Sequence, residues 1–341
     1  MERTVASNSA GEDCTGGTVL AWYQRPRVLY FSQFFLFAAI NSRFNSIFFM
    51  YKGMSESQIG VILSIHQLMG IFVNPAWTIV ADACANTIKL VFVCSFGACA
   101  SFLLYSAANT FGWILIVRIL FSCFFPPIAS LLDAFALQSF KSHTVGGETA
   151  SGKYGLERLW GAVSWAIAHT LIGVSMDASP LGPSVILIFA VVNMIIFAVT
   201  VKSFLRLQPR AAIAVDTVTD TVAPSRFKRL EMWKPKSIMS IMFRNKLTIA
   251  FFLDIMVMGM AVSLVEGLVF LFFVRDMKAS FTLCGLSVVV TVLFEIPIFA
   301  MAPKITKRFS HQTLLLIAHV AYIVRVVGYT FLPNPWLVLF L

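Results

Sequence analysis

Apolar residues occur along this chain in long runs separated by short polar segments, which is the pattern of membrane-spanning helices. About 20 residues of α-helix cross the hydrocarbon core of a bilayer. Runs of about this length cover residues 28–51, 59–81, 88–108, 113–136, 158–176, 184–203, 248–274, 280–302 and 312–331. We therefore predict an all-α multi-pass membrane protein, with a further helix beginning at 335–341. Pro126 and Pro127 are expected to kink the fourth span.

A long polar stretch divides the predicted spans into two groups. The first 27 residues form a polar tail, and residues 28–203 hold six spans. Residues 204–247 form a basic linker, and 248–341 hold three spans and the start of a tenth. Six helices, a long loop and further helices are typical of a two-bundle transporter, so we expect a six-helix bundle followed by an incomplete second bundle.

The basic residues predict the orientation of the chain in the membrane. With a cytosolic N-terminus, 20 of the 26 Lys and Arg residues fall on the cytosolic side and only three on the other. This bias follows the positive-inside rule, and the linker is then cytosolic. We expect the plasma membrane rather than an organelle membrane. The net charge of +10 is a topology signal and does not indicate nucleic-acid binding.

The composition excludes most other classes of protein. The chain is 58% hydrophobic and 12% charged, whereas soluble proteins carry about 25% charged residues. The sequence contains no phosphate-binding loop, no nucleophile with a base at a recognisable spacing and no zinc-like spacing. We therefore expect no catalytic residue, no metal and no cofactor, and the protein is predicted not to be an enzyme.

Charged side chains inside the predicted spans are the main candidates for function. A charge at the centre of a bilayer costs about 2.5 to 3.5 kcal/mol on insertion scales. We expect such charges to face one another or a wet cavity, as along the pathway of a polar solute. They are Arg43, Arg118, Asp133, Asp254, Glu266, Glu295 and Arg325.

Three separated motifs stand out along the chain. The first is a Tyr-Gly-x-x-Arg-Leu-Trp-Gly run, matched by Tyr154, Gly155, Arg158, Leu159, Trp160 and Gly161. The second is Glu295-Ile-Pro297 in the eighth span, and the third surrounds Arg325 in the ninth. Together they resemble one branch of the major facilitator superfamily, the branch of phenylpropionate permease and lactose-permease-like proton symporters. The resemblance implies the major facilitator fold. That fold has twelve helices, so we expect the chain to be truncated within its tenth.

The loop after the second span departs from the superfamily. Only Asp82 remains of its Gly-x-x-x-Asp-Arg-x-Gly-Arg-Arg motif, and the basic residues are replaced. Asp82, Asp133 and Arg158 are the candidate gating residues. Arg118 resembles the helix 4 arginine of the superfamily, although Ser122 stands where glycine is expected.

Glu295 and Arg325 are the candidates for proton coupling. The resemblance implies that an acid on helix 8 and an arginine on helix 9 take part in proton coupling and substrate binding. Burial favours the neutral form of a carboxyl and a nearby cation favours the charged form, so small movements of such a pair can load or release a proton. A fixed structural ion pair is the alternative.

Four further residues are candidates for a solute cavity: Glu266, Arg118, Arg43 and Asn41. For Arg43 and Asn41 the alternative is helix packing through interhelical hydrogen bonds. Asp254 is expected to pair with a basic residue of the linker. His66 and His169 are either titrating groups or hydrogen-bonded packing residues.

The function expected from the sequence is secondary active transport of a small organic solute by alternating access, with coupling to protons as a symporter. The partners are then the solute, protons and the lipid bilayer, and the protein is expected to be a monomer. Two alternatives remain open: a receptor or scaffold that does not transport, and an inactive fragment of a major facilitator protein.

Overall fold

The computed structural model describes residues 26–84, 87–141, 150–207 and 245–340, and within these ranges the regular structure is entirely helical. Helices occupy every predicted span. They are α1 (Pro26–Ile40), α2 (Asn45–Tyr51), α3 (Glu56–Ala83), α4 (Thr87–Leu103), α5 (Phe111–Ser122), α6 (Pro127–Lys141), α7 (Ala150–Ala178), α8 (Val185–Leu207), α12 (Lys246–Arg275), α13 (Phe281–Arg308) and α14 (His311–Thr330). Short 3₁₀ helices lie at Leu104–Ser106 (η2), Gly182–Ser184 (η3) and Pro335–Phe340 (η4).

Two of the predicted spans are interrupted. The fourth is divided into α5 and α6, and α6 begins at Pro127, which confirms the expected effect of the two prolines. The first is divided into α1 and α2 by four residues, 41–44, that form no helix. Eight segments of the described residues are long and apolar enough to cross a membrane as they stand. The broken first span is the ninth crossing expected from the sequence.

Polar residues between the spans act as helix caps. The Ser55 side chain accepts a hydrogen bond from the Gln58 backbone at the start of α3, and the Gln58 side chain accepts one from the Ser55 backbone, which completes a capping box. Ser280, Ser310 and Asn245 cap α13, α14 and α12 through their side chains. Each cap satisfies a backbone N–H group that the first helical turn leaves without a partner.

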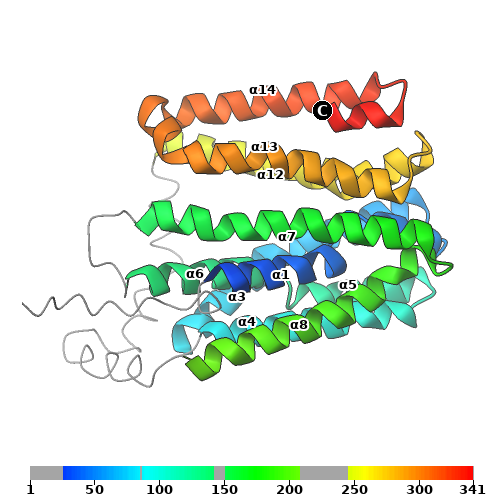
Figure 1. The fold of residues 1–341 in the computed structure, drawn as a ribbon, viewed down its shortest axis with the longest axis horizontal. Coiled ribbons are helices and arrows are strands. Elements are labelled where there is room, and N and C mark those ends of the chain that lie inside the picture. The colour runs from blue at the N-terminus through cyan, green and yellow to red at the C-terminus, as the bar shows by residue number, and fades with distance from the viewer. Residues whose placement is uncertain (1–25, 85–86, 142–149, 208–244, 341) are drawn as a thin grey trace, which may run out of the picture.

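The helices lie side by side along the long axis of the molecule (Figure 1). We call α1 to α8 the N-terminal helices and α12 to α14 the C-terminal helices. Helix α7 contacts α1 on one side and α13 on the other, so it joins the two groups. We call the end where α1 begins the entry end, and the end with the α7–α8 and α12–α13 turns the hairpin end.

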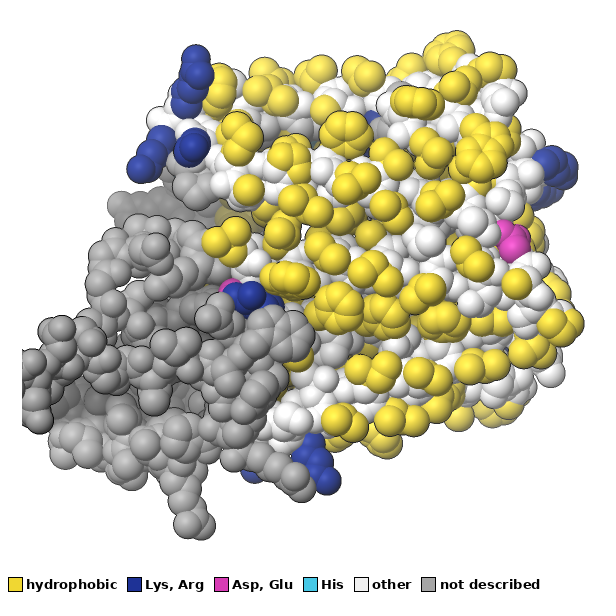
Figure 2. Space-filling view, viewed as in Figure 1, with side chains coloured by type: hydrophobic (Ala, Val, Ile, Leu, Met, Phe, Trp, Pro, Cys, Tyr) yellow, Lys and Arg dark blue, Asp and Glu magenta, His cyan; other side chains and the backbone are white. Residues whose placement is uncertain are grey.

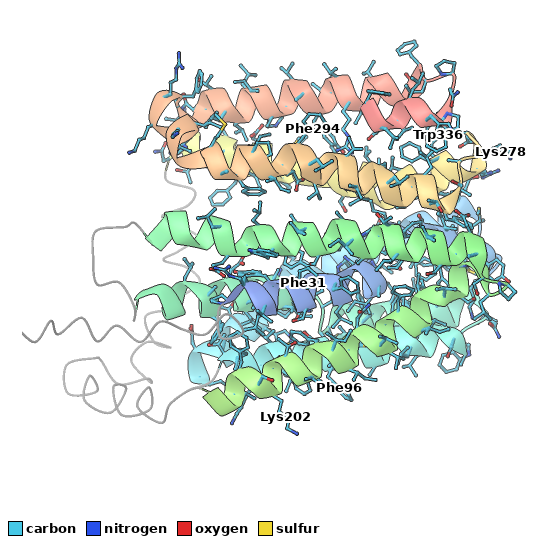
Figure 3. The ribbon with its side chains drawn as sticks, viewed as in Figure 1. Phe31, Phe96, Lys202, Lys278, Phe294 and Trp336 are labelled. Atoms are coloured by element: carbon cyan, nitrogen blue, oxygen red, sulfur yellow. The ribbon has the colours of Figure 1, made fainter. Side chains whose placement is uncertain are left out.

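The outer surface is that of a protein embedded in lipid. Figure 2 shows hydrophobic side chains across the middle of one face, while Lys and Arg gather toward its edges. Phe96 and Phe294 are 57% and 69% exposed and point outward from α4 and α13, whereas Lys202 and Lys278 lie near opposite ends (Figure 3). Large exposed apolar patches of this kind are rare on soluble proteins.

Helices α7 and α13 approach closely because glycine lies at their contact. A Cβ atom on Gly285 would lie 2.6 Å from the His169 carbonyl oxygen and 2.9 Å from the Thr170 Cα atom. Gly173 faces the backbone of Phe281 in the same way. Backbone atoms cannot move aside as a flexible side chain can, so this contact requires glycine.

Replacing Gly285 by Ala is therefore expected to lower the melting temperature of the protein in detergent. Overpacking costs about 1 to 3 kcal/mol, which corresponds to a shift of roughly 5 °C. Gly259→Ala on α12 is the matched control, because a Cβ atom there would meet nothing within 4 Å. Equal melting temperatures for the two variants would contradict the close approach of α7 and α13.

Candidate solute and proton site

Glu266 forms the centre of a charged cluster that joins the N-terminal and C-terminal helices. This α12 carboxylate forms an ion pair with Arg43, from the break between α1 and α2. It forms a second with Arg325 of α14, whose Nη1 lies 3.6 Å from Glu266 Oε1. The Nε of Arg325 also donates to the Tyr329 hydroxyl at 2.6 Å. One carboxylate thus serves two guanidinium groups, one from each group of helices.

Glu295 on α13 is the second acid of this cluster. It is half-buried and interacts electrostatically with Arg43, Glu266 and Arg325. Among the residues that the structure describes, no cation lies within salt-bridge distance of it, and the direct partner of Arg325 is Glu266. The structure therefore brings together four of the seven charges singled out in the sequence, with Glu266 rather than Glu295 at their centre.

The break in the first span explains how Arg43 reaches this cluster. On a continuous helix, Asn41 and Asn45 would share a face and Arg43 would point away from it. Residues 41–44 are not helical, so that periodicity does not apply to them. Asn45 donates from Nδ2 to the Ile40 carbonyl oxygen at 3.1 Å across the break. Asn41, which follows Ile40 in the chain, is half-buried.

Arg118 lies apart from the cluster, within the N-terminal helices. It is 2% exposed, and its Nε and Nη1 atoms have no hydrogen-bond partner among the described residues. Its guanidinium carbon lies 5.1 Å from the centre of the Phe121 ring, and the group interacts electrostatically with His66 and Tyr105. His66 Nδ1 lies 3.0 Å from Ser122 Oγ, so this histidine has a hydrogen-bond partner in the packed interior.

Two of the predicted gating residues meet near the entry end. Asp133 of α6 accepts a hydrogen bond from the Tyr30 hydroxyl at 2.8 Å, and Arg158 of α7 lies 3.6 Å from its other oxygen. Arg27 and Glu157, which sequence reasoning missed, form a two-bond ion pair beside them, at 2.9 and 3.2 Å. These contacts join α1, α6 and α7, all of them N-terminal helices. Asp82 is exposed at the end of α3.

One motif residue of α7, Gly161, lies at the contact of α7 with α1. A Cβ atom on Gly161 would lie 2.9 Å from the Phe34 ring, so glycine permits the close approach. Gly155 is half-buried and Trp160 is 38% exposed. Tyr154 belongs to α7, but its side chain lies outside the described residues. Pro297 lies on an exposed face of α13.

Asp254 pairs within the C-terminal helices. Its Oδ1 lies 3.2 Å from Nε2 of His319, so this contact joins α12 to α14. The sequence led us to expect a partner in the linker, most of which, residues 208–244, lies outside the described part of the chain.

The hairpin end carries two further contacts between the N-terminal and C-terminal helices. Asp177 at the end of α7 accepts hydrogen bonds from Phe281 N at 3.2 Å, from Thr282 N at 2.7 Å and from Thr282 Oγ1 at 2.6 Å. Glu56 at the start of α3 forms an ion pair with Arg275 at the end of α12. Sequence reasoning missed both, because it singled out the charges inside the apolar spans and, outside them, only the family-motif residue Asp82 among the acidic residues.

Two hollows lie at contacts between the N-terminal and C-terminal helices. An apolar hollow of about 370 Å³ lies between α7 and α13 and is lined by residues that include Val163, Ala166, Val289 and Ile296. Glu56 and Arg275 line a second hollow of about 440 Å³ at the hairpin end. None of the four clustered charges lines either hollow. No three His, Cys, Asp or Glu side chains of the described residues lie close enough to hold a metal ion.

A multi-pass helical membrane protein whose ion pairs join two groups of helices has the organisation of a two-bundle membrane transporter. The comparison of sequences gives the family: residues 26–341 match the MFS_1 like family, and the chain belongs to it. Because the members of this family are transporters, the chain is a membrane protein that handles a small solute, and it is not an enzyme.

Individual relatives agree with the family. The chain is 24% identical to the maltose permease of Geobacillus stearothermophilus over 91% of its own length and 72% of the permease. It is 23% identical to the uncharacterized transporter YwbF of Bacillus subtilis (strain 168) over 84% of this chain and 64% of that protein. The crystal structure of nucleoside transporter NupG matches 94% of this chain and 77% of NupG, with a TM-score of 0.68 and 18% identity. This last likeness is one of fold.

Proposed function

We propose that this protein is a proton-coupled symporter of a small organic solute that works by alternating access. The observation that carries the proposal is the position of Glu266, which pairs with Arg43 of the N-terminal helices and Arg325 of the C-terminal helices. Charges within the membrane are costly unless they are paired. Movement of one group of helices against the other would remove a partner from Glu266, and a proton or a solute group would have to replace it.

Glu295 and Arg325 are the proposed proton-coupling residues. The proposed solute contacts are Arg43, Glu266, Asn41 and Arg118. Glu295 has three charged neighbours but no direct ion pair among the described residues. An acid of this kind can gain or lose a proton without first breaking a salt bridge. This supports Glu295 as the group that carries the proton.

The contacts between the two groups of helices support a transporter that is closed at one end. Asp177 binds the start of α13, and Glu56 pairs with Arg275, both at the hairpin end. The α7–α13 contact is close at Gly285, whereas an apolar hollow separates the same helices at Val163 and Ile296. With the cytosolic N-terminus that the basic residues favour, the closed end faces outward. Asp82, Asp133 and Arg158 would then act at the cytosolic side.

The wider proposal keeps the organisation expected from the sequence. A six-helix bundle at 28–203 precedes a cytosolic linker at 204–247, and a second bundle begins at 248. The protein would work as a monomer in the plasma membrane. Because one relative is named a maltose permease and one similar structure a nucleoside transporter, sugars and nucleosides are the first solutes to test. We assign the chain to the lactose-permease-like branch on the three motifs described above.

Uptake into proteoliposomes tests the proposal. The purified protein is reconstituted, a pH gradient is imposed with the lumen alkaline, and entry of radiolabelled maltose and a nucleoside is measured with and without a protonophore. The proposal predicts uptake against the solute gradient that the protonophore abolishes. Solute binding without uptake would favour a receptor, and neither binding nor uptake of any tested solute would contradict transport.

Replacing Asp177 by Ala is expected to loosen the closed end. Asn41→Cys supplies a reporter in the candidate cavity, and labelling by a membrane-impermeant maleimide added outside measures access from that side. Loss of the three hydrogen bonds to a carboxylate should speed labelling at least about tenfold. Asp276→Ala is the control, since Asp276 is an exposed carboxylate at the same end. Equal labelling rates in the two variants would contradict a gate at Asp177.

A further inference from the structure

His169 lies where α7 meets the break in the first span. Its ring is fully buried and packs against Trp165, Phe44 and Phe270, with ring centres 4.3, 5.9 and 6.3 Å away. Phe44 belongs to the break and Phe270 to α12, so this histidine contacts both groups of helices. Arg43 directly precedes Phe44 in the chain, and its guanidinium carbon lies 5.8 Å from the centre of the Phe270 ring.

Hydrogen bonds connect His169 to the backbone of the break. His169 Nδ1 lies 2.9 Å from the Trp165 carbonyl oxygen, and Nε2 lies 3.2 Å from Ser42 Oγ. Because a carbonyl oxygen can only accept, Nδ1 carries the proton, and Nε2 of the neutral ring accepts from the Ser42 hydroxyl. Ser42 Oγ in turn accepts from the Phe44 backbone N–H at 3.0 Å. Each group in this series of hydrogen bonds is therefore fixed as a donor or an acceptor in each bond.

A broken helix within a membrane needs partners for the backbone groups that the break releases. Ser42 supplies one for Phe44, and its hydroxyl proton needs an acceptor that His169 provides. Arg43 stands between Ser42 and Phe44, so the same bonds fix the backbone on both sides of it. The direction in which the Arg43 side chain points from the backbone depends on these hydrogen bonds.

We propose that His169 is a positioning residue that holds the break in the first span so that Arg43 meets Glu266. It acts through Ser42 and does not itself contact the solute. This inference rests on the proposed function for the role of Arg43 in solute transport, whereas the effect of His169 on the break is a property of the structure alone.

Two substitutions of His169 separate its hydrogen bond from its packing. The side-chain amide of glutamine reaches about as far as Nε2 of histidine, and its oxygen can accept from the Ser42 hydroxyl as Nε2 does. The side-chain amide of asparagine reaches only about as far as Nδ1. His169→Gln therefore keeps the bond to Ser42, and His169→Asn loses it. Ser42→Ala removes the same bond from the other side and is the matched partner for a double-mutant cycle.

The first measurement is amide hydrogen exchange over residues 41–45, which does not depend on transport. We expect exchange about tenfold faster in His169→Asn and in Ser42→Ala, with His169→Gln close to wild type and the double variant His169→Asn/Ser42→Ala no faster than either single one. Equal exchange in His169→Asn, His169→Gln and wild type would overturn the inference, as would additive effects in the double variant.

The second measurement is uptake kinetics in proteoliposomes. The KM for solute should rise about tenfold in His169→Asn and Ser42→Ala, while His169→Gln stays within about threefold of wild type. Faster exchange with an unchanged KM would overturn the link to Arg43. Absence of uptake by the wild-type protein would contradict the proposed function, and hydrogen exchange would still decide whether His169 holds the break.

Discussion

Replacing Glu266 by Gln is expected to reduce the initial rate of solute uptake by roughly 100-fold or more. The substitution removes the carboxylate that Arg43 and Arg325 share and leaves two guanidinium groups without it. Removing one partner of a buried ion pair costs about 3 to 5 kcal/mol, and these pairs are half-buried, so the loss should lie near the lower value. A loss of about 3 kcal/mol corresponds to roughly 100-fold, because each 1.4 kcal/mol is a factor of ten. The measurement is uptake by equal amounts of reconstituted protein.

Asp276→Asn is the control for this variant, because it removes a carboxylate from an exposed position at the end of the same helix. It should leave uptake unchanged. The double variant Arg43→Gln/Glu266→Gln removes one of the two uncompensated cations and should have a higher melting temperature than Glu266→Gln alone. Normal uptake by Glu266→Gln would show that the shared carboxylate is not needed for transport.

The second large effect is expected at Glu295. In Glu295→Gln the side chain can no longer take up or release a proton, so accumulation driven by a pH gradient should fall at least about tenfold. Exchange of solute between the two sides requires no net proton movement and should persist. This difference separates a defect in coupling from a defect in solute binding.

Glu157→Gln is a suitable comparison for Glu295→Gln, since Glu157 pairs with Arg27 inside the N-terminal helices, away from the proposed site. It should retain accumulation driven by the pH gradient. Accumulation by Glu295→Gln at the wild-type level would exclude this residue from proton coupling. Loss of both accumulation and exchange would instead assign Glu295 to the solute site.

The spans could be predicted from the sequence because a membrane helix needs about 20 apolar residues whatever its neighbours are. The break in the fourth span was also predictable, since Pro127 lacks a backbone N–H group. The break in the first span was not. Residues 41–44 contain neither proline nor glycine, and Ser42 finds its partner His169 more than a hundred residues away.

The residues of the candidate site could be predicted from the sequence, but the ion pairs that they form could not. Charged residues within apolar spans can be recognised from the sequence alone. The structure places four of them, Arg43, Glu266, Glu295 and Arg325, in one cluster. Which acid meets which arginine depends on the rotation and spacing of the helices, which hydrophobic runs do not specify. Asp177 lay beyond the apolar core of its span and was therefore not considered.

A disulfide bond across the closed end tests alternating access most directly. Cysteines replace Asp177 and Thr282, whose side chains are in contact, in a background without the other cysteines. Oxidation should then lock the hairpin end and stop solute uptake, and reduction should restore it. Uptake that continues at the unlocked rate after complete cross-linking would contradict the account, because α7 and α13 would not have to separate there during transport.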